Sequence, residues 1–340
     1  MQDGKYGDRK YLAKYDLSVE LFERFGIKVN DVVPVRNVFI ISSDKGNKVF
    51  KKVDYSIEEL EFINKAIEYV KNKFSRIMSF EKTVNGGIYT LWNNDVYCVM
   101  DLIEGRECDY SNPVDIAITS KALGELHRAS EGFRTDLVYK NLRGNTIEDF
   151  KRRYEEMGFF KNIAQLHEYK TEFDDIFLGN VDYYMKEINK SIKLLEASPY
   201  YKLCGEDDKI ALCHHDLAYH NILINNEEAY FIDFDYAIVD LKIHDLCNFI
   251  YKAIKHSAFD MEKADIIIEN YCIKNTLDRK ELEVLHALLA FPQDFYTISR
   301  DYYTRRKEWE EEVFVDRFNR KLEFKEDKEE FLEEFSRKYK

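Results

Sequence analysis

The stretch CHHDLAYHNILI, residues 213–224, concentrates side chains that could do chemistry. Three histidines lie within seven positions, together with Asp216 and Asn221. A zinc site would need a tetrahedral ligand set, and no cysteine or carboxylate nearby in the chain completes one. The DLAY break between the histidines also favours a loop over a helix that would present two of them on one face. The metal-cluster interpretation is therefore the weaker of the two that this stretch allows.

The second interpretation is a phosphoryl-transfer loop. Phosphoryl transfer needs a carboxylate that accepts the proton of the attacking hydroxyl, and oxygen ligands that hold Mg²⁺ against the nucleotide phosphates. Asp216 fits the first role, and Asn221 and Asp233 fit the second because Mg²⁺ prefers hard oxygen ligands. NILINNEEAYFIDFD predicts two strands around a turn. Such a hairpin would place Asn221 and Asp233 at facing ends, within reach of one cation.

The chain before residue 100 must supply the nucleotide contacts. In VFKKV, Val49, Lys51 and Val53 share one strand face. We therefore expect Lys51 to point into a cleft and to pair with the α- and β-phosphates. Glu59 borders the apolar stripe of the following predicted helix and is the expected carboxylate partner of Lys51. The alternative for Glu59 is an ordinary charge on a helix surface.

Two further segments support this arrangement. YCVMDLIEGREC predicts a joint at residues 100–105, whose backbone could bind adenine. Met100 and Leu102 would pack near the base, and Glu104 belongs to the same nucleotide-binding set. Asp245, in KIHDLCNFI, lies at a predicted helix start. We expect it to bond to the backbone of the 213–221 loop and to have a structural role.

The remaining pattern predicts an α+β protein with two lobes. Strand-like runs occur at 35–42 and 47–54, a helical stripe follows at 57–70, and three more strand-like runs lie at 80–84, 87–93 and 95–103. A short helix is expected at 11–27, and the chain is mainly helical from residue 113. We therefore expect an N-lobe at 1–100, a hinge at 101–105, and a helical C-lobe at 106–340 that carries the catalytic hairpin 213–235.

The composition of the chain limits the classes of molecule that it could bind. The net charge of −13 gives no general attraction for nucleic acid or anionic lipid. No apolar run approaches the ~20 residues of a membrane helix. The six cysteines form no CxxC pair and lie mostly in apolar runs, which indicates reduced thiols and synthesis in the cytoplasm. The acidic balance would suit a cationic acceptor, although solubility alone also explains it.

At this point the chain resembles a known family. The carriers are LIEGREC (102–108), LGELHRASEGF (123–133), CHHDLAYHNILI, YFIDFDYAIVDLKIHDLCNFI (230–250), LLAFPQDFYTI (288–298) and YYTRRKEW (302–309). They are similar to CotS-type spore coat proteins, a branch of the aminoglycoside phosphotransferase and choline kinase group. The resemblance implies a bilobal protein-kinase-like fold, ATP and Mg²⁺ as ligands, synthesis in the mother cell, and a place in the spore coat. It also implies a catalytic role for Asp216, metal binding by Asn221 and Asp233, and nucleotide binding by Lys51.

The sequence departs from the usual pattern of that group at two points. The loop usually reads HGD, and here His215 replaces the glycine. The first hairpin also has no glycine-rich phosphate cover. Two hypotheses follow: a phosphotransferase acting on a hydroxyl of a small molecule or coat component, or a catalytically silent scaffold that binds other coat proteins. The 24 tyrosines would suit such interfaces, or would equally fill cores.

Overall fold

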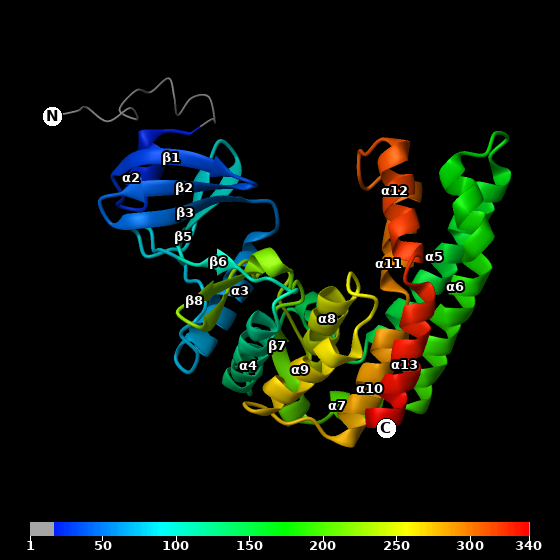
Figure 1. Ribbon diagram of the computed structural model, residues 1–340. Coiled ribbons are helices and arrows are strands. Elements are labelled where there is room, and N and C mark those ends of the chain that lie inside the picture. The colour runs from blue at the N-terminus through cyan, green and yellow to red at the C-terminus, as the bar shows by residue number, and fades with distance from the viewer. Residues whose placement is uncertain (1–16, 340) are drawn as a thin grey trace. The chain divides into compact units, whose positions relative to one another are not determined.

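The computed structural model describes residues 17–339, which fall into two compact units (Figure 1). Unit 1 comprises the residues up to Cys108 together with Tyr219–Ala237, and unit 2 comprises Asp109–Ala218 with the chain from Ile238 onward. The sequence pattern assigned the whole hairpin 213–235 to the helical lobe, whereas most of it groups with unit 1. The helix expected at 11–27 lies partly outside the described residues, and within them it is α2, Val19–Glu23.

Unit 1 is built on a five-stranded antiparallel sheet of order β1-β2-β3-β5-β4. Its strands are β1 (Val29–Val35), β2 (Val38–Ser43), β3 (Gly46–Val53), β4 (Thr90–Trp92) and β5 (Asp95–Asp101). The inner face packs on α2, where Phe22, Phe50 and Tyr97 form a buried aromatic stack. The β2–β3 hairpin pairs Ser43 with Gly46, as the sequence predicts for this turn.

One strand of this sheet was predicted at the wrong residues. Residues 80–84 form only an isolated bridge between Phe80 and Met100, and Thr83 turns the chain back through a bond from its N–H to the carbonyl of Gly87. The fifth strand is instead β1, whose Pro34 and irregular register between Val29 and Asp31 weaken the strand signal. Pro34 is tolerated because β1 lies at the edge of the sheet.

Helix α3 (Ile57–Lys71) belongs to unit 1 and begins at a capping box. The hydroxyl of Ser56 accepts from the backbone N–H of Glu59, and the Glu59 carboxylate accepts from the Ser56 N–H. Two helix N–H groups are satisfied in this way. The apolar stripe predicted from the sequence is buried from Leu60 to Val70.

A second, three-stranded sheet explains why the hairpin groups with unit 1. It has the order β6-β8-β9, formed by Arg106–Glu107, Ile222–Asn225 and Glu228–Phe231. Phe231 also exchanges backbone hydrogen bonds with the chain after α3, at Arg76 and Met78. A β-carbon on Gly105 would lie 3.0 Å from the carbonyl oxygen of Ile224, so the residue before β6 must be glycine for β8 to approach this closely.

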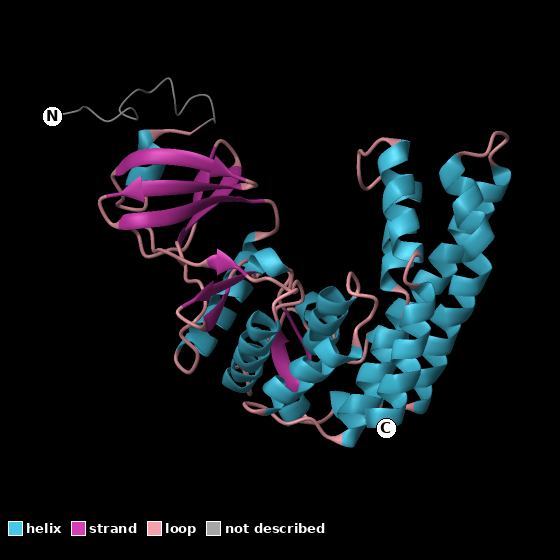
Figure 2. Cartoon of the chain, viewed as in Figure 1, coloured by secondary structure: helices cyan, strands magenta, loops and turns pink. Residues whose placement is uncertain are grey.

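Unit 2 is mainly helical (Figure 2). Its long helices are α4 (Pro113–Ala129), α5 (Thr146–Leu166), α6 (Glu172–Ala197), α8 (Lys242–Ile254), α9 (Met261–Cys272), α10 (Arg279–Ala290), α11 (Gln293–Tyr303), α12 (Glu311–Leu322) and α13 (Lys325–Tyr339). The short helix α7 (Tyr200–Cys204) precedes a two-stranded sheet of β7 (Ile210–Cys213) and β10 (Ile238–Leu241). None of the helices in residues 17–339 is both long and apolar enough to cross a membrane.

Candidate functional site

In unit 1 the side chains of Lys51, Asp233 and Asp235 form a charged cluster. The Lys51 ammonium lies 3.0 Å from Oδ1 of Asp233 and also pairs with Oδ2 of Asp235. The Tyr55 hydroxyl donates to Oδ1 of Asp235 at 3.0 Å. The side chain of Lys51 is only 12% exposed, because it lies on the strand face predicted to carry it. A lysine of β3 and the aspartate after β9 thus meet across 182 residues of chain.

The charges in this cluster depend on one another. Burial would lower the pKa of Lys51, but the carboxylates of Asp235 and Asp233 outweigh it and raise that pKa above its ordinary value. Burial raises the pKa of Asp235, and the Asp233 charge adds to this while Lys51 opposes it. Burial and the neighbouring Asp235 charge also raise the pKa of Tyr55. The raised pKa of Lys51 keeps it cationic, and its charge opposes the rise in the pKa of Asp235.

The expected pairing of Lys51 with Glu59 stays a prediction. Lys51 takes Asp233 and Asp235 as its partners. The Glu59 carboxylate lies at the start of α3, where it closes the capping box on Ser56 at 3.3 Å. Its position at the third residue of the helix accounts for this use.

Asn221 and Asp233 lie at the same end of the β8–β9 hairpin. The N–H of Ile232, the residue before Asp233, donates to the Asn221 carbonyl at 3.0 Å. Asn221 is buried, and Asp233 adopts a left-handed backbone conformation with φ of 63°. A carboxylate and an amide on one hairpin end form an oxygen donor set that suits Mg²⁺. These two residues therefore fit the metal that a kinase-like fold implies.

The expected adenine-binding residues lie at the end of β5 and just after it. Met100 is buried and pairs with Val49 of β3, while Leu102 is half-buried. Glu104 is exposed, and its carbonyl accepts from the Asn225 side chain at 3.1 Å. That carbonyl is thereby tied to β8. Contacts of these three residues with adenine stay a prediction.

Asp216 lies in unit 2, on a loop held by one face of α8. Its Oδ1 pairs with the Lys252 ammonium. Asp245 accepts from the backbone N–H of His214 at 2.5 Å and of His215 at 2.7 Å. The side chain of Asn248 accepts from the Leu217 N–H at 3.1 Å. The predicted structural role of Asp245 is confirmed, because this buried carboxylate holds two consecutive loop amides.

The lowered pKa of Asp245 is consistent with this role. Burial would raise its pKa, but hydrogen bonding and charge from His127, with the loop amides, lower it below the ordinary value. His127 lies 3.2 Å from Asp245 through Nε2 and 2.8 Å from the Tyr271 hydroxyl through Nδ1. His127, Cys213 and Asp245 have donor atoms close enough for a metal. Their donors are already used by these bonds, so we interpret the group as a hydrogen-bonded core.

His215 adopts φ of 65°, the left-handed region that glycine enters without steric cost. The glycine usual at this position is therefore explained by backbone conformation. The His215 ring is exposed, so the substitution adds a side chain outside the loop rather than filling its interior. The loop keeps its hydrogen bonds to Asp245, at the cost of a strained residue.

Sequence reasoning missed four residues that the structure places beside the predicted ones. Asp235 and Tyr55 complete the Lys51 cluster, and Lys252 and Asn248 contact the Asp216 loop. The signal for the last two was present in α8. Spacings of three and four residues put Asp245, Asn248 and Lys252 on one helix face.

Comparisons with known proteins agree with this geometry. The family model described as "Spore coat putative kinase YutH" matches residues 18–335. Spore coat protein S of Bacillus subtilis (strain 168) is 24% identical over 310 residues, which are 90% of this chain and 88% of that protein.

Solved structures extend the likeness to the fold. An aminoglycoside phosphotransferase from Alicyclobacillus acidocaldarius has a TM-score of 0.83 at 17% identity, covering 95% of this chain and 96% of its own. A spectinomycin phosphotransferase in complex with ADP and spectinomycin has a TM-score of 0.65 at 16% identity, covering 94% and 97%. The predicted α+β, protein-kinase-like fold is confirmed.

Proposed function

The chain belongs to this family of spore coat kinase-like proteins, and on that premise we propose that it is an ATP- and Mg²⁺-dependent phosphotransferase of the spore coat. It transfers phosphate to a hydroxyl group of a small molecule or a coat component. The single observation that carries the proposal is the Lys51–Asp233 pair at 3.0 Å. A nucleotide lysine and a metal-binding aspartate must act on the same phosphates, and here they are adjacent.

Each residue has a defined task in this reaction. Asp216 accepts the proton of the acceptor hydroxyl, and Lys252 fixes the position of its carboxylate. Lys51 leaves its carboxylate partners to contact the nucleotide phosphates. Asn221 and Asp233 would hold Mg²⁺, which supplies neutralisation of the phosphate charge.

The loop backbone contributes positioning. Asp245 and Asn248 fix the amides on both sides of Asp216, so that its carboxylate has few rotational alternatives. Positioning of this kind lowers the entropic part of the barrier. It also explains why a strained His215 is tolerated, since two charge-assisted bonds stabilise the loop around it.

Calorimetry of Mg·ATP binding tests the proposal. We expect binding to wild type, and a loss of about tenfold or more in Asp233→Asn, since a charged contact contributes about 1.5–3 kcal/mol. Asp95→Asn is the matched control, because Asp95 pairs with Lys52 elsewhere in unit 1. The Asp216→Asn variant should still bind the nucleotide, but it should no longer hydrolyse ATP slowly when water takes the place of the acceptor. Absent binding, or equal affinity in Asp233→Asn, would contradict the proposal.

The second candidate function is a silent scaffold of the coat. Exposed tyrosines favour it, since Tyr169, Tyr201 and Tyr236 present their rings to solvent and could serve as interface aromatics. A fluorescent fusion separates location from chemistry. Recruitment to the forespore surface that persists in Asp216→Asn would show a coat role independent of transfer, and a fusion that stays diffuse would exclude the coat for both candidates.

A further inference from the structure

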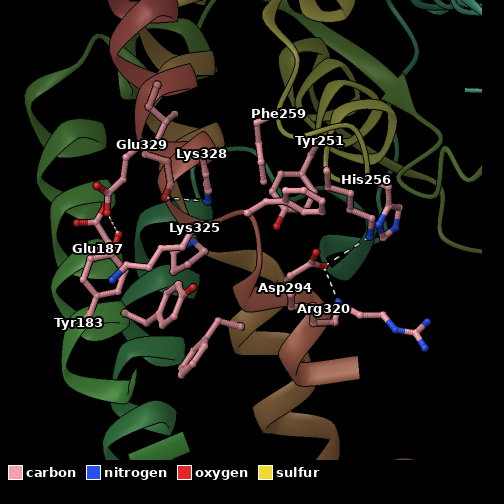
Figure 3. A pocket seen from close by; sticks show the side chains of 18 of the residues that line it. Tyr183, Glu187, Tyr251, His256, Phe259, Asp294, Arg320, Lys325, Lys328 and Glu329 are labelled. Atoms are coloured by element: carbon pink, nitrogen blue, oxygen red, sulfur yellow. Dashed lines mark hydrogen bonds and ion pairs between the residues drawn. The ribbon is translucent and has the colours of Figure 1, made fainter. Parts of the chain in front are cut away.

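Unit 2 contains a cavity of about 340 Å³ between α6, the end of α8, α11, α12 and α13 (Figure 3). This volume suits a small molecule. Six basic side chains line it: Lys255, Arg317, Arg320, Lys321, Lys325 and Lys328. Three acidic side chains line it as well: Glu187, Asp294 and Glu329. The cavity thus has a formal surplus of three positive charges in a chain whose net charge is −13.

Asp294 is the acidic side chain with which two of these lysines pair. Lys321 lies 3.0 Å and Lys255 3.5 Å from its Oδ1. The Lys328 ammonium enters from α13 and donates to the carbonyls of Phe291 at 2.9 Å and Ala290 at 3.4 Å. Two ammonium groups therefore pair with one carboxylate, and a third, that of Lys328, feels its charge while bonding to backbone carbonyls.

The remaining acidic groups do not balance these lysines. Glu329 accepts a hydrogen bond from the Tyr183 hydroxyl, and Lys325 lies over the Tyr183 ring at 3.4 Å from its centroid. Burial lowers the pKa of Lys328 to about 8, with Asp294 opposing it. Burial also lowers the pKa of Lys321, and the nearby Lys255 charge adds to this. Holding cations together in this way is unfavourable unless an anion joins them.

The cavity is linked to Asp216 through one face of α8. Along this face Asp245, Asn248 and Lys252 contact the Asp216 loop. Lys255, the residue that caps the C-terminus of α8, and His256 in the following turn line the cavity. The lysine that pairs with Asp216 and the first lysine of the cavity are therefore only three residues apart, at the end of one helix.

The walls of the cavity also favour a ring-shaped or polyol ligand. Aromatic side chains supply much of the lining, including Tyr184, Tyr251, Phe259 and Phe295. Flat aromatic faces pack against the apolar faces of a sugar ring while lysines bind its charged group. The cavity therefore combines a cationic side with an apolar side.

We propose that this cavity binds the acceptor of the phosphotransferase, and that the acceptor is an anionic, hydroxyl-bearing small molecule of the size of a sugar phosphate. The inference rests on the proposed function and adds the class of substrate to it. It replaces the cationic acceptor suggested by the net charge of the chain, because the local charge of the cavity has the opposite sign to that of the whole protein. An amine-bearing acceptor would meet three ammonium groups here.

Calorimetry with matched probes tests this site. The probes are glucose 6-phosphate, glucose, inorganic phosphate and choline, each titrated into the full chain at fixed low ionic strength. We expect glucose 6-phosphate to bind, and glucose and choline to show no measurable heat. Inorganic phosphate should compete with glucose 6-phosphate, since both would use the same lysines.

Variants locate the binding. Lys321→Gln and Lys328→Gln should each weaken glucose 6-phosphate binding about tenfold, the loss expected for one charged contact. Lys338→Gln is the matched control on α13, because Lys338 pairs with Asp265 away from the cavity. If Lys328→Gln unfolds, Lys321→Gln still tests the site, because the Lys321 side chain is partly exposed and its replacement should disturb the fold less. Equal affinity in all three variants, or binding of choline in place of glucose 6-phosphate, would overturn the proposal.

The same experiment separates this inference from the proposed function. Anion binding without Mg·ATP binding would leave the cavity assignment standing and refute phosphoryl transfer. Mg·ATP binding without anion binding would refute the acceptor class alone.

Discussion

Replacing Lys51 by methionine probes the charge cluster most directly. Methionine keeps the apolar stem of the lysine and removes the ammonium that pairs with Asp233 and Asp235. The two adjacent carboxylates then lose the ammonium that they share. We expect the variant to fold, since the sheet around β3 keeps its packing, and to be less stable at neutral pH.

The magnitude follows from how exposed each partner is. Breaking a fully buried ion pair costs about 3–5 kcal/mol, whereas an exposed pair contributes about 0–1 kcal/mol. The side chains of Lys51, Asp235 and Asp233 are 12%, 22% and 42% exposed. The Asp235 contact lies near the buried limit and the Asp233 contact near the exposed one. We expect a loss of about 2 kcal/mol in the free energy of unfolding.

The loss should depend on pH. The pKa of Asp235 is raised in the folded state, so ionising it disfavours the fold as pH rises through that pKa, and Lys51 opposes this effect. Without Lys51 the pKa of Asp235 rises further. The difference between variant and wild type is therefore smaller at pH 4 than at pH 7, because it shrinks as pH falls through the pKa of Asp235. The pKa of Lys51 itself is raised above 10.5, so its contribution persists until strongly alkaline pH.

Urea denaturation at pH 4 and pH 7 measures both quantities. Lys52→Met is the matched control, since Lys52 is the next residue on the opposite strand face and its side chain is mostly exposed beside Asp95. It should change the free energy of unfolding by less than about 0.5 kcal/mol. Equal effects of the two variants at pH 7, or a Lys51→Met effect that grows toward pH 4, would refute the reasoning.

Three further predictions concern unit 2. His215→Gly should raise the free energy of unfolding by roughly 0.5–1 kcal/mol in urea denaturation, since glycine removes the left-handed strain; a less stable variant would contradict this. Asp245→Asn should lower it by about 2–3 kcal/mol, because one amide oxygen cannot accept from both loop amides as the carboxylate does, and an unchanged urea midpoint would count against that role. Affinity for glucose 6-phosphate should be full below about pH 8 and decline above it, as Lys328 loses its proton beside Asp294; calorimetry at pH 7 and pH 9 checks this, and the decline should flatten in Lys328→Gln.

The groups facing Lys328 support the sign of that last prediction. They come from three elements: Asp294 on α11, Cys247 on α8, and Glu187 and Lys190 on α6. Burial raises the pKa of Cys247 to about 12, so its thiol is neutral throughout this range. The Asp294 carboxyl has a lowered pKa because Lys255 and Lys321 outweigh its burial. Lys328 is therefore the group among these that changes charge near pH 8.

Patterns local in the chain were predictable from the sequence. The alternation of VFKKV placed Lys51 on the strand face of Val49 and Val53, and the order of Asp216, Asn221 and Asp233 indicated the kinase-like fold. The β2–β3 turn was readable for the same reason. In each case the information lies within a few residues of the feature itself.

Features that depend on tertiary contacts were not predictable. Asp233, a partner of Lys51, lies 182 residues away, whereas Glu59 was expected as the partner because it borders the apolar stripe of the following helix. Strand β1 was missed because Pro34 and Asp31 weaken its pattern, while residues 80–84 alternate like a strand and have no sustained ladder. The cationic cavity combines side chains from five helices, so the net charge of −13 concealed its sign.

The edge strand β1 has a consequence for how copies of this protein meet. An unpaired strand edge can recruit a strand from another molecule and begin an aggregate. Here Pro34 removes one N–H from the edge, and the irregularity between Val29 and Asp31 breaks the repeat that an incoming strand would have to match. Both features make this edge a poor template for a strand from a second copy of the chain.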